Sequence, residues 1–186
     1  MKKLPWLLVV MLLTGCSILP KPAPAPALHD FGPPPSGPTV ATGPAQISVS
    51  APAWLDDTTI YYRLMYSDPT QLHSYADNRW LAPPAQLLQV RVRAAFADGK
   101  AHYRLQVRLL DVEQIFDTAQ SAHISLRALV ELQDLSDGET TAQHLFVVSV
   151  SASPDVQGAV SGDAHAADEL IAQLVEWTQS QLSHRP

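Results

Sequence analysis

The sequence has 186 residues, of which 46% are hydrophobic and 16% charged, and its formal net charge at pH 7 is −6. A chain of this length fits one domain with a sizeable core. The charge balance excludes nucleic acid as a partner, because binding to phosphates requires a basic face. Nothing after residue 16 is apolar enough to cross a membrane.

The N-terminus has the pattern of an export signal. Lys2 and Lys3 precede an apolar run, Leu4 to Leu13, which is much shorter than the ~20 residues of a membrane span. The run ends in Leu13-Thr14-Gly15-Cys16, which resembles the lipobox of bacterial lipoproteins. Residues 1–15 are therefore predicted to be a signal peptide that is cleaved before Cys16. The alternative is an ordinary secretory signal that ends near a cysteine by chance.

The cysteine at this junction has no partner of its own kind. Cys16 is the only cysteine of the chain, so it cannot form an internal disulfide in the oxidising compartment that export implies. Covalent lipid on Cys16 explains an isolated thiol, and several acyl chains, palmitate among them, anchor a protein stably where one is marginal. No other cofactor is predicted. Because Ser17 stands where an aspartate commonly retains lipoproteins in the inner membrane, the expected location is the periplasmic face of the outer membrane.

A proline-rich stretch follows the lipidation site. Residues 17–44 contain nine of the sixteen prolines and show no apolar periodicity. Such a stretch favours extended polyproline II structure, which rises ~3.1 Å per residue, so it could reach on the order of 80 Å. Residues 16–44 are predicted to be a lipidated tether, and recognition by an SH3-like module is the alternative.

The folded domain is expected over residues 45–186, as an α+β structure. Alternating apolar positions predict strands, proline in a first turn predicts a helix start at Pro83-Pro84, and Asp163 is expected to cap a last helix. The expected order is β-β-β-α-β-β-β-α, an antiparallel sheet with both helices packed on one face. The predicted strands cover residues 46–50, 59–66, 71–76, 103–116, 122–135 and 143–151.

Catalytic and metal sites are not expected. Histidines recur every 21 residues at His102, His123, His144 and His165, but in a meander the first three would start successive strands and alternate between opposite ends of the sheet. The spacing therefore reflects strand and turn lengths, with a loose internal repeat as an alternative. No nucleophile elbow or phosphate-binding glycine loop is present, and the protein is predicted not to be an enzyme.

One segment of the sequence is distinctive. Its most specific parts are Pro52-Ala53-Trp54-Leu55-Asp56, Tyr62-Arg63-Leu64-Met65-Tyr66, Tyr75-Ala76-Asp77-Asn78-Arg79-Trp80 and Pro83-Pro84-Ala85-Gln86-Leu87-Leu88. Together with the lipobox and the proline-rich stretch, these parts resemble the ABC-type transport auxiliary lipoprotein component family, the PqiC-like proteins. The likeness extends over about residues 45–183.

The resemblance implies a non-enzymatic partner of an MCE-type ABC system that moves lipids between the inner and outer membranes. It further implies a ring-forming homo-oligomer that receives the periplasmic MCE-domain protein. Within this segment the candidate contacts with a subunit or partner are Trp54, Arg63, Arg79 and Trp80; alternatively, the stretch ending in Trp80 only docks the following helix on the sheet. The competing function is that of a free-standing lipoprotein that supports envelope assembly or binds peptidoglycan.

Overall fold

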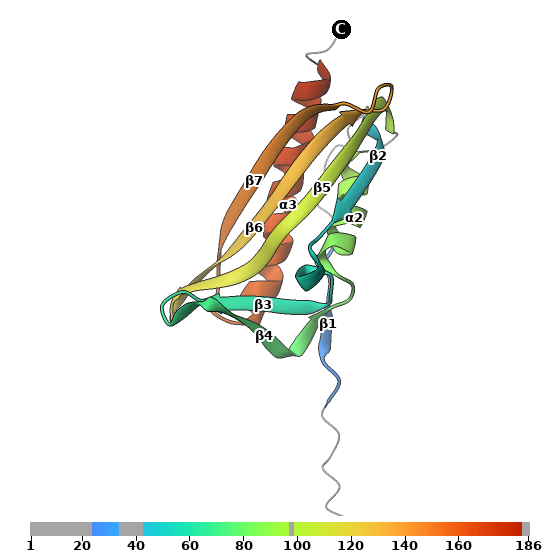
Figure 1. Cartoon of the computed structure of the whole chain (residues 1–186). Coiled ribbons are helices and arrows are strands. Elements are labelled where there is room, and N and C mark those ends of the chain that lie inside the picture. The colour runs from blue at the N-terminus through green and yellow to red at the C-terminus, as the bar shows by residue number, and fades with distance from the viewer. Residues whose placement is uncertain (1–23, 34–42, 97–98, 184–186) are drawn as a thin grey trace, which may run out of the picture.

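The computed structural model describes residues 24–33, 43–96 and 99–183 (Figure 1). The described part forms one seven-stranded sheet and two α-helices. The strands are β1 Ala27–His29, β2 Gly43–Ser50, β3 Thr59–Leu64, β4 Asp68–Trp80, β5 Gly99–Thr118, β6 Ser121–Asp134 and β7 Thr140–Ala152. The helices are α2 Pro84–Ala95 and α3 Val156–Ser183, and a short 3-10 helix, η1, spans Ala53–Leu55.

The sheet is organised around the long strand β5. β2 pairs with the first half of β5 and β3 with the second half, so the two shorter strands lie end to end along one side of β5. β6 pairs with the other side, β7 pairs with β6, and β4 and β1 extend the sheet beyond β3.

The expected α+β class is confirmed, but a strictly antiparallel sheet is wrong because the sheet is mixed. β2 and β3 both run parallel to β5, and β1 runs parallel to β4. Between β3 and β5 the chain passes through β4 and α2, and this long connection allows β5 to run parallel to β3. The turns that join β5 to β6 and β6 to β7 are short, so these strands are antiparallel.

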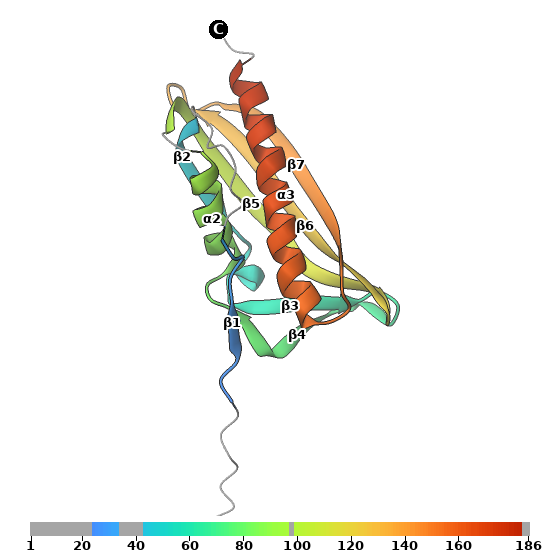
Figure 2. The same ribbon diagram turned by 180° about the vertical axis from the view of Figure 1, so that it is seen from behind.

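Both helices cover the same face of the sheet (Figure 2). The core lies between α3 and the alternate residues of β6 that include Ile124, Leu126 and Val130, all fully or almost fully buried. Gly162 of α3 lies so close to the sheet that a Cβ there would stand 2.5 Å from Cγ1 of Ile124. A glycine inside this helix therefore permits close helix-to-sheet packing.

The last helix begins earlier than its expected cap. α3 starts at Val156, where the Asp155 carboxylate accepts a hydrogen bond from the Gly158 amide at 2.7 Å, as an N-terminal capping residue does. Asp163 lies within the helix and is 3% exposed. The expectation that Asp163 caps the helix is therefore wrong, because an earlier aspartate fulfils that role.

Part of the expected tether belongs to the fold. We call residues 24–33 the N-terminal strap: its strand β1 pairs with the end of β4, and Phe31 is buried against Trp80 with the two rings edge-to-face at 5.1 Å. The His29 ring is hydrogen-bonded to Asn78 at 2.8 Å. The expected domain start at Ala45 is therefore too late, because β1 and Phe31 join the sheet and the core.

The strap is also held by a buried arginine of α2. Arg91 donates hydrogen bonds to the carbonyl oxygens of Phe31 at 2.9 Å and Pro33 at 3.5 Å, and it forms an ion pair with Asp168 of α3. One side chain thereby joins the strap to both helices. Cys16 and the predicted signal peptide lie outside the described residues, among which no helix is long and apolar enough to span a membrane.

Candidate interaction surface

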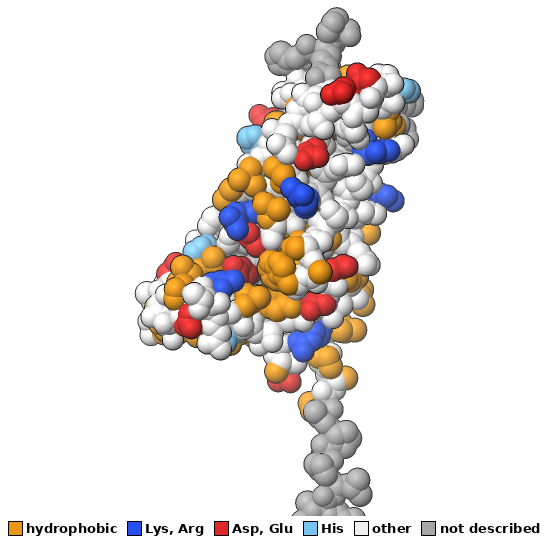
Figure 3. Space-filling model, in the orientation of Figure 1, with side chains coloured by type: hydrophobic (Ala, Val, Ile, Leu, Met, Phe, Trp, Pro, Cys, Tyr) orange, Lys and Arg blue, Asp and Glu red, His pale blue; other side chains and the backbone are white. Residues whose placement is uncertain are grey.

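The sheet face opposite the helices carries exposed apolar side chains. We call it the open face and define it by Tyr61, Arg63, Asp111, Glu113, Arg127, Leu129, Leu145 and Val147. On it, Leu129 of β6 lies opposite Leu145 of β7, and Arg127 lies opposite Val147. Leu145 and Val147 are 47% and 59% exposed. Figure 3 shows apolar side chains gathered on this face, with charged side chains between them.

An irregularity in β5 decides which of its residues reach the open face. The register between β5 and β6 shifts between Leu109 and Asp111. Leu105, Val107 and Leu109 are buried before the shift, and Val112 and Phe116 after it, so the core-facing positions change from odd to even. This β-bulge turns Asp111 and Glu113 toward the open face.

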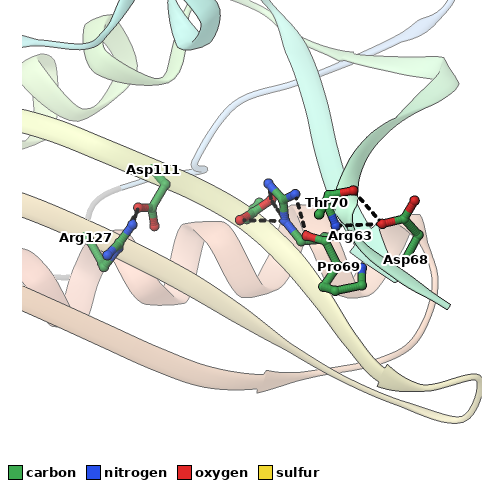
Figure 4. Close-up of polar contacts among 7 residues, drawn as sticks. Arg63, Asp68, Pro69, Thr70, Asp111 and Arg127 are labelled. Carbon is green, nitrogen blue, oxygen red and sulfur yellow. Dashed lines mark hydrogen bonds and ion pairs between the residues drawn. The ribbon is translucent and has the colours of Figure 1, made fainter. Parts of the chain in front are cut away.

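Two ion pairs neutralise these carboxylates (Figure 4). The Asp111 carboxylate accepts a hydrogen bond from Nε of Arg127 at 2.6 Å, and this contact raises the pKa of the arginine. Glu113 is paired with Arg63 at 3.1 Å, and Arg63 also donates to the Pro69 carbonyl at 3.0 Å. Both carboxylate side chains are largely buried. The charges at the centre of the open face are therefore already compensated within the chain.

An exposed tryptophan stands beside this face. Trp54 of η1 is 43% exposed, and its ring meets that of Tyr61 edge-to-face at 5.9 Å. Tyr61 lies two positions before Arg63 in β3, hence on the same face, and its hydroxyl donates to Asp57 at 3.0 Å. Burial and this hydrogen bond raise the pKa of Tyr61. The contacts hold the indole in place while leaving much of it accessible.

The four candidate contact residues do not form one cluster. Trp54 and Arg63 flank Tyr61 at the open face, whereas Arg79 donates to the carbonyls of Tyr75 and Asn78 in its own strand. Trp80 is 2% exposed beneath the strap. Trp80 is thus a core residue that docks the N-terminal strap, and Arg79 stabilises the end of β4.

Sequence reasoning missed the residues that make up most of the open face. Leu129, Leu145 and Val147 follow the alternation of β6 and β7, and a usable signal was present: residues 140–152 contain no charge, although every second position of an exposed strand is usually polar. Asp111 and Glu113 carried no such signal, because a bulge changes the alternation without a clear mark in the sequence.

A hollow lies beside β2 and the C-terminal end of α2. It has a volume of about 580 Å³ and is lined mainly by β2, with Arg93, Phe96 and Arg104. Arg93 donates to the Ile47 carbonyl, and Arg104 to the side chains of Gln46 and Gln133. These arginines are used in tying elements together. Within the described ranges no group of histidine, cysteine and acidic side chains is arranged to hold a metal ion.

The fold is shared with solved structures. A protein from Xanthomonas campestris, described under the family DUF330, is similar with a TM-score of 0.69 at 19% identity, over 86% of this chain and 94% of that one. A second, described as an uncharacterized protein, has a TM-score of 0.59 at 15% identity, over 82% of this chain and 98% of that one. No family model matches the sequence, and no curated protein is significantly similar to it. The domain thus has the fold of the DUF330 structure, and at such identities the likeness defines the fold alone.

Proposed function

We propose that this protein is a lipoprotein anchored through Cys16 to the periplasmic face of the outer membrane, where it is the auxiliary component of an MCE-type ABC lipid transport system. In this role it self-associates, binds the periplasmic MCE-domain protein and catalyses no reaction. The lipobox-like sequence before the sole cysteine supports the anchor, and Ser17 supports the outer membrane. The resemblance of residues 52–88 to the PqiC-like family supports the transport role.

The open face is the observation that carries this proposal. It combines exposed apolar side chains, Leu145 and Val147, with the ordered indole of Trp54. Partly exposed aromatic and arginine side chains are the usual anchors of protein interfaces. Because Asp111 and Glu113 are already paired, a partner can cover this face without leaving a buried carboxylate uncompensated.

Capture of the partner in cells tests the proposal. A photoactivatable amino acid at position 54 should cross-link to an MCE-domain protein. Trp54→Ala should weaken binding of purified partner by about thirty-fold, as loss of an interface tryptophan worth ~2 kcal/mol implies. Val90→Ala is the matched control, because Val90 is 70% exposed on α2 and remote from the open face.

Two outcomes would contradict the proposal. One is equal capture by the Trp54→Ala and Val90→Ala variants together with no cross-link to an MCE protein. The other is robust turnover of ATP or of ester substrates by the purified protein. The melting temperature of each variant serves as a check, since an exposed substitution away from the core should change stability by no more than ~0.5 kcal/mol.

A further inference from the structure

Four exposed apolar side chains lie around the two ends of β4. Met65 and Tyr66 belong to the turn just before this strand, Leu28 lies in β1, and Leu81 directly follows the last residue of β4. Their exposed fractions run from 45% to 62%. We call these four residues the apolar end. Eight large hydrophobic side chains are exposed in the described part of the chain, and half of them are therefore concentrated here.

The turn between β3 and β4 holds its two apolar residues in place. The Met65 amide donates a hydrogen bond to the Phe116 carbonyl of β5 at 3.0 Å, and the Ser67 amide donates one to the Leu64 carbonyl at 3.1 Å. The backbone of the turn is thus fixed to the sheet while the side chains of Met65 and Tyr66 remain exposed. Binding through these side chains would not require the backbone to be ordered first.

The two leucines of the apolar end lie on the same side of the sheet. Leu28 is in register with Arg79, and Leu81 comes two positions after Arg79, so alternation places both leucines on one face. The Leu81 amide donates to the His29 carbonyl at 2.7 Å, which continues the pairing of β1 with β4. Figure 3 shows hydrophobic side chains gathered at the lower end of the molecule, where the described chain begins.

We propose that the apolar end rests on the phospholipid surface that holds the acyl chains of Cys16, with Leu28, Met65, Tyr66 and Leu81 in the interfacial layer. This inference rests on the lipid anchor of the proposed function but not on the transport role. None of the four residues belongs to the open face. Membrane contact and partner binding therefore use separate surfaces.

The position of the anchor favours a lipid surface as the occupant. Residues 17–26 separate Cys16 from β1, and at ~3.1 Å per residue they span at most about 30 Å. Leu28 is the second residue of β1, so the apolar end is the part of the domain that the anchor holds closest to the bilayer. A short tether gives the lipid surface a high effective concentration, and a weak apolar contact is then sufficient.

The residues between the two pairs limit how deep the contact can be. β1 covers only residues 78–80 of β4, and the part of the strand that it leaves uncovered carries Asp68 and Asp77. Main-chain groups of an uncovered strand need water or polar headgroups, which the hydrocarbon core does not provide. Tyrosine is common at membrane interfaces, where its ring is apolar and its hydroxyl is hydrated. We therefore expect shallow contact with zwitterionic headgroups, because anionic lipid would repel Asp68 and Asp77.

The depth of single labels tests the contact. Because Cys16 is the only cysteine and its thiol carries lipid in the mature chain, Tyr66→Cys and Leu81→Cys each offer one site for a nitroxide. The full-length lipidated protein is placed on vesicles of phosphatidylcholine and phosphatidylethanolamine. Both labels should collide with a water-soluble nickel complex about threefold less often than a label at Val90→Cys, as interfacial burial implies. Val90 is the matched control, because it is 70% exposed on α2.

A pair of charges tests whether both ends of β4 rest on the same surface. Leu28→Asp combined with Leu81→Asp should return the label at position 66 to the aqueous collision rate, although neither substitution is in the turn. Val90→Asp combined with Val147→Asp is the control, since it adds the same charge at two exposed valines and should leave the label shielded. The melting temperature of each variant should stay unchanged, because all four side chains are exposed.

Two outcomes would overturn the inference while leaving the anchor intact. One is equal nickel accessibility at positions 66, 81 and 90 in protein that floats with the vesicles. The other is shielding that appears only after purified MCE-domain protein is added, which would assign the apolar end to that partner. Protein that does not float would refute the anchor and the inference together. Shielded labels without capture of an MCE protein would support the inference while the transport role fails.

Discussion

The buried polar side chains of this domain differ in whether they find hydrogen-bond partners. Gln114 is fully buried. Its Nε2 donates a hydrogen bond to the Ser153 carbonyl at 2.6 Å, and its Oε1 accepts one from the Tyr75 hydroxyl at 2.5 Å. Burial raises the pKa of Tyr75, which keeps this hydroxyl protonated. Asp163 is the opposite case, because it is buried in α3 and its Oδ1 has no hydrogen-bond partner within the described part of the chain.

The buried carboxyl of Asp163 makes stability depend on pH. Burial raises its pKa well above the ordinary value of 3.8. The folded state has the raised pKa, and the unfolded state has the ordinary one. At a pH between these two values the carboxyl is mostly protonated in the folded state and mostly ionised in the unfolded state. The free energy of unfolding therefore falls as pH rises through that window. The destabilisation caused by Asp163 is greatest above its folded-state pKa.

We accordingly predict that Asp163→Asn stabilises the protein at neutral pH. The amide cannot ionise, so the variant avoids the cost of keeping a buried carboxyl protonated at neutral pH, which is about 1.4 kcal/mol for each unit by which burial raises the pKa of Asp163. The gain should shrink as pH falls toward 4, because Asp163 is then protonated in the folded state and partly protonated in the unfolded state, where its pKa is close to 3.8. Urea unfolding of both proteins between pH 4 and pH 8 measures this. A variant that is less stable at every pH would show that the carboxylate has a favourable partner.

At the scale of elements, the N-terminal strap is the unexpected feature. It adds β1 to the sheet, Phe31 to the core and two carbonyl ligands to Arg91. Without the strap, the Arg91 guanidinium would keep only its ion pair with Asp168, and one face of Trp80 would be exposed. A domain cut at residue 45 is therefore incomplete.

We predict that a fragment of residues 24–186 is more stable than one of residues 45–186. Burial of Phe31 alone should contribute about 1.5–3 kcal/mol, and the longer fragment should unfold at correspondingly higher urea concentration. Phe31→Ala in the longer fragment should remove most of that difference. Equal unfolding midpoints for the two fragments would mean that the strap is not held in solution.

The sequence was informative about elements whose pattern is local. Alternation predicted β6 almost to the residue, and Pro83-Pro84 correctly predicted the start of α2. The β1 strand could not be found in this way, because it has three residues and its pairing with residues 78–80 depends on long-range contacts. The parallel pairing of β2 and β3 with β5 likewise follows from the path of the chain and not from either strand's own pattern.

The candidate contact residues show the same limit. Trp54 was singled out as a candidate contact within the distinctive segment, and it is exposed. Trp80 was singled out with it, with docking of the following helix as the alternative, and its contact with Phe31, 49 positions earlier in the chain, could not be foreseen. Residue type predicts what a side chain can do, whereas distant segments decide whether it is accessible.

At the scale of the whole molecule, the strap would shorten the reach of the proposed lipid anchor. Docking begins at Ala27, so the chain between Cys16 and the sheet consists of residues 17–26. At ~3.1 Å per residue these can span about 30 Å, against about 80 Å for a tether that continued to residue 44. If Cys16 carries lipid as proposed, the end of the domain formed by β1, β3 and β4 (Figure 1) lies nearest the membrane.

The anchor itself is tested by Cys16→Ala. We predict that the variant accumulates as an uncleaved, unlipidated precursor, because the sequence has no other thiol to accept the lipid. Labelling with a radioactive fatty acid, followed by membrane fractionation, measures this. Normal acyl labelling of the variant in the outer-membrane fraction would contradict the assignment of the lipobox.

The end-to-end placement of β2 and β3 along β5 also bears on the order in which the chain folds. Arg63 and Glu113 are 50 positions apart, and a chain made N-terminus first delivers β2 and β3 well before the strand that completes them. The later β5, β6 and β7 meet through short turns and close only small loops. We therefore expect the C-terminal half to form a template on which the older N-terminal half docks last.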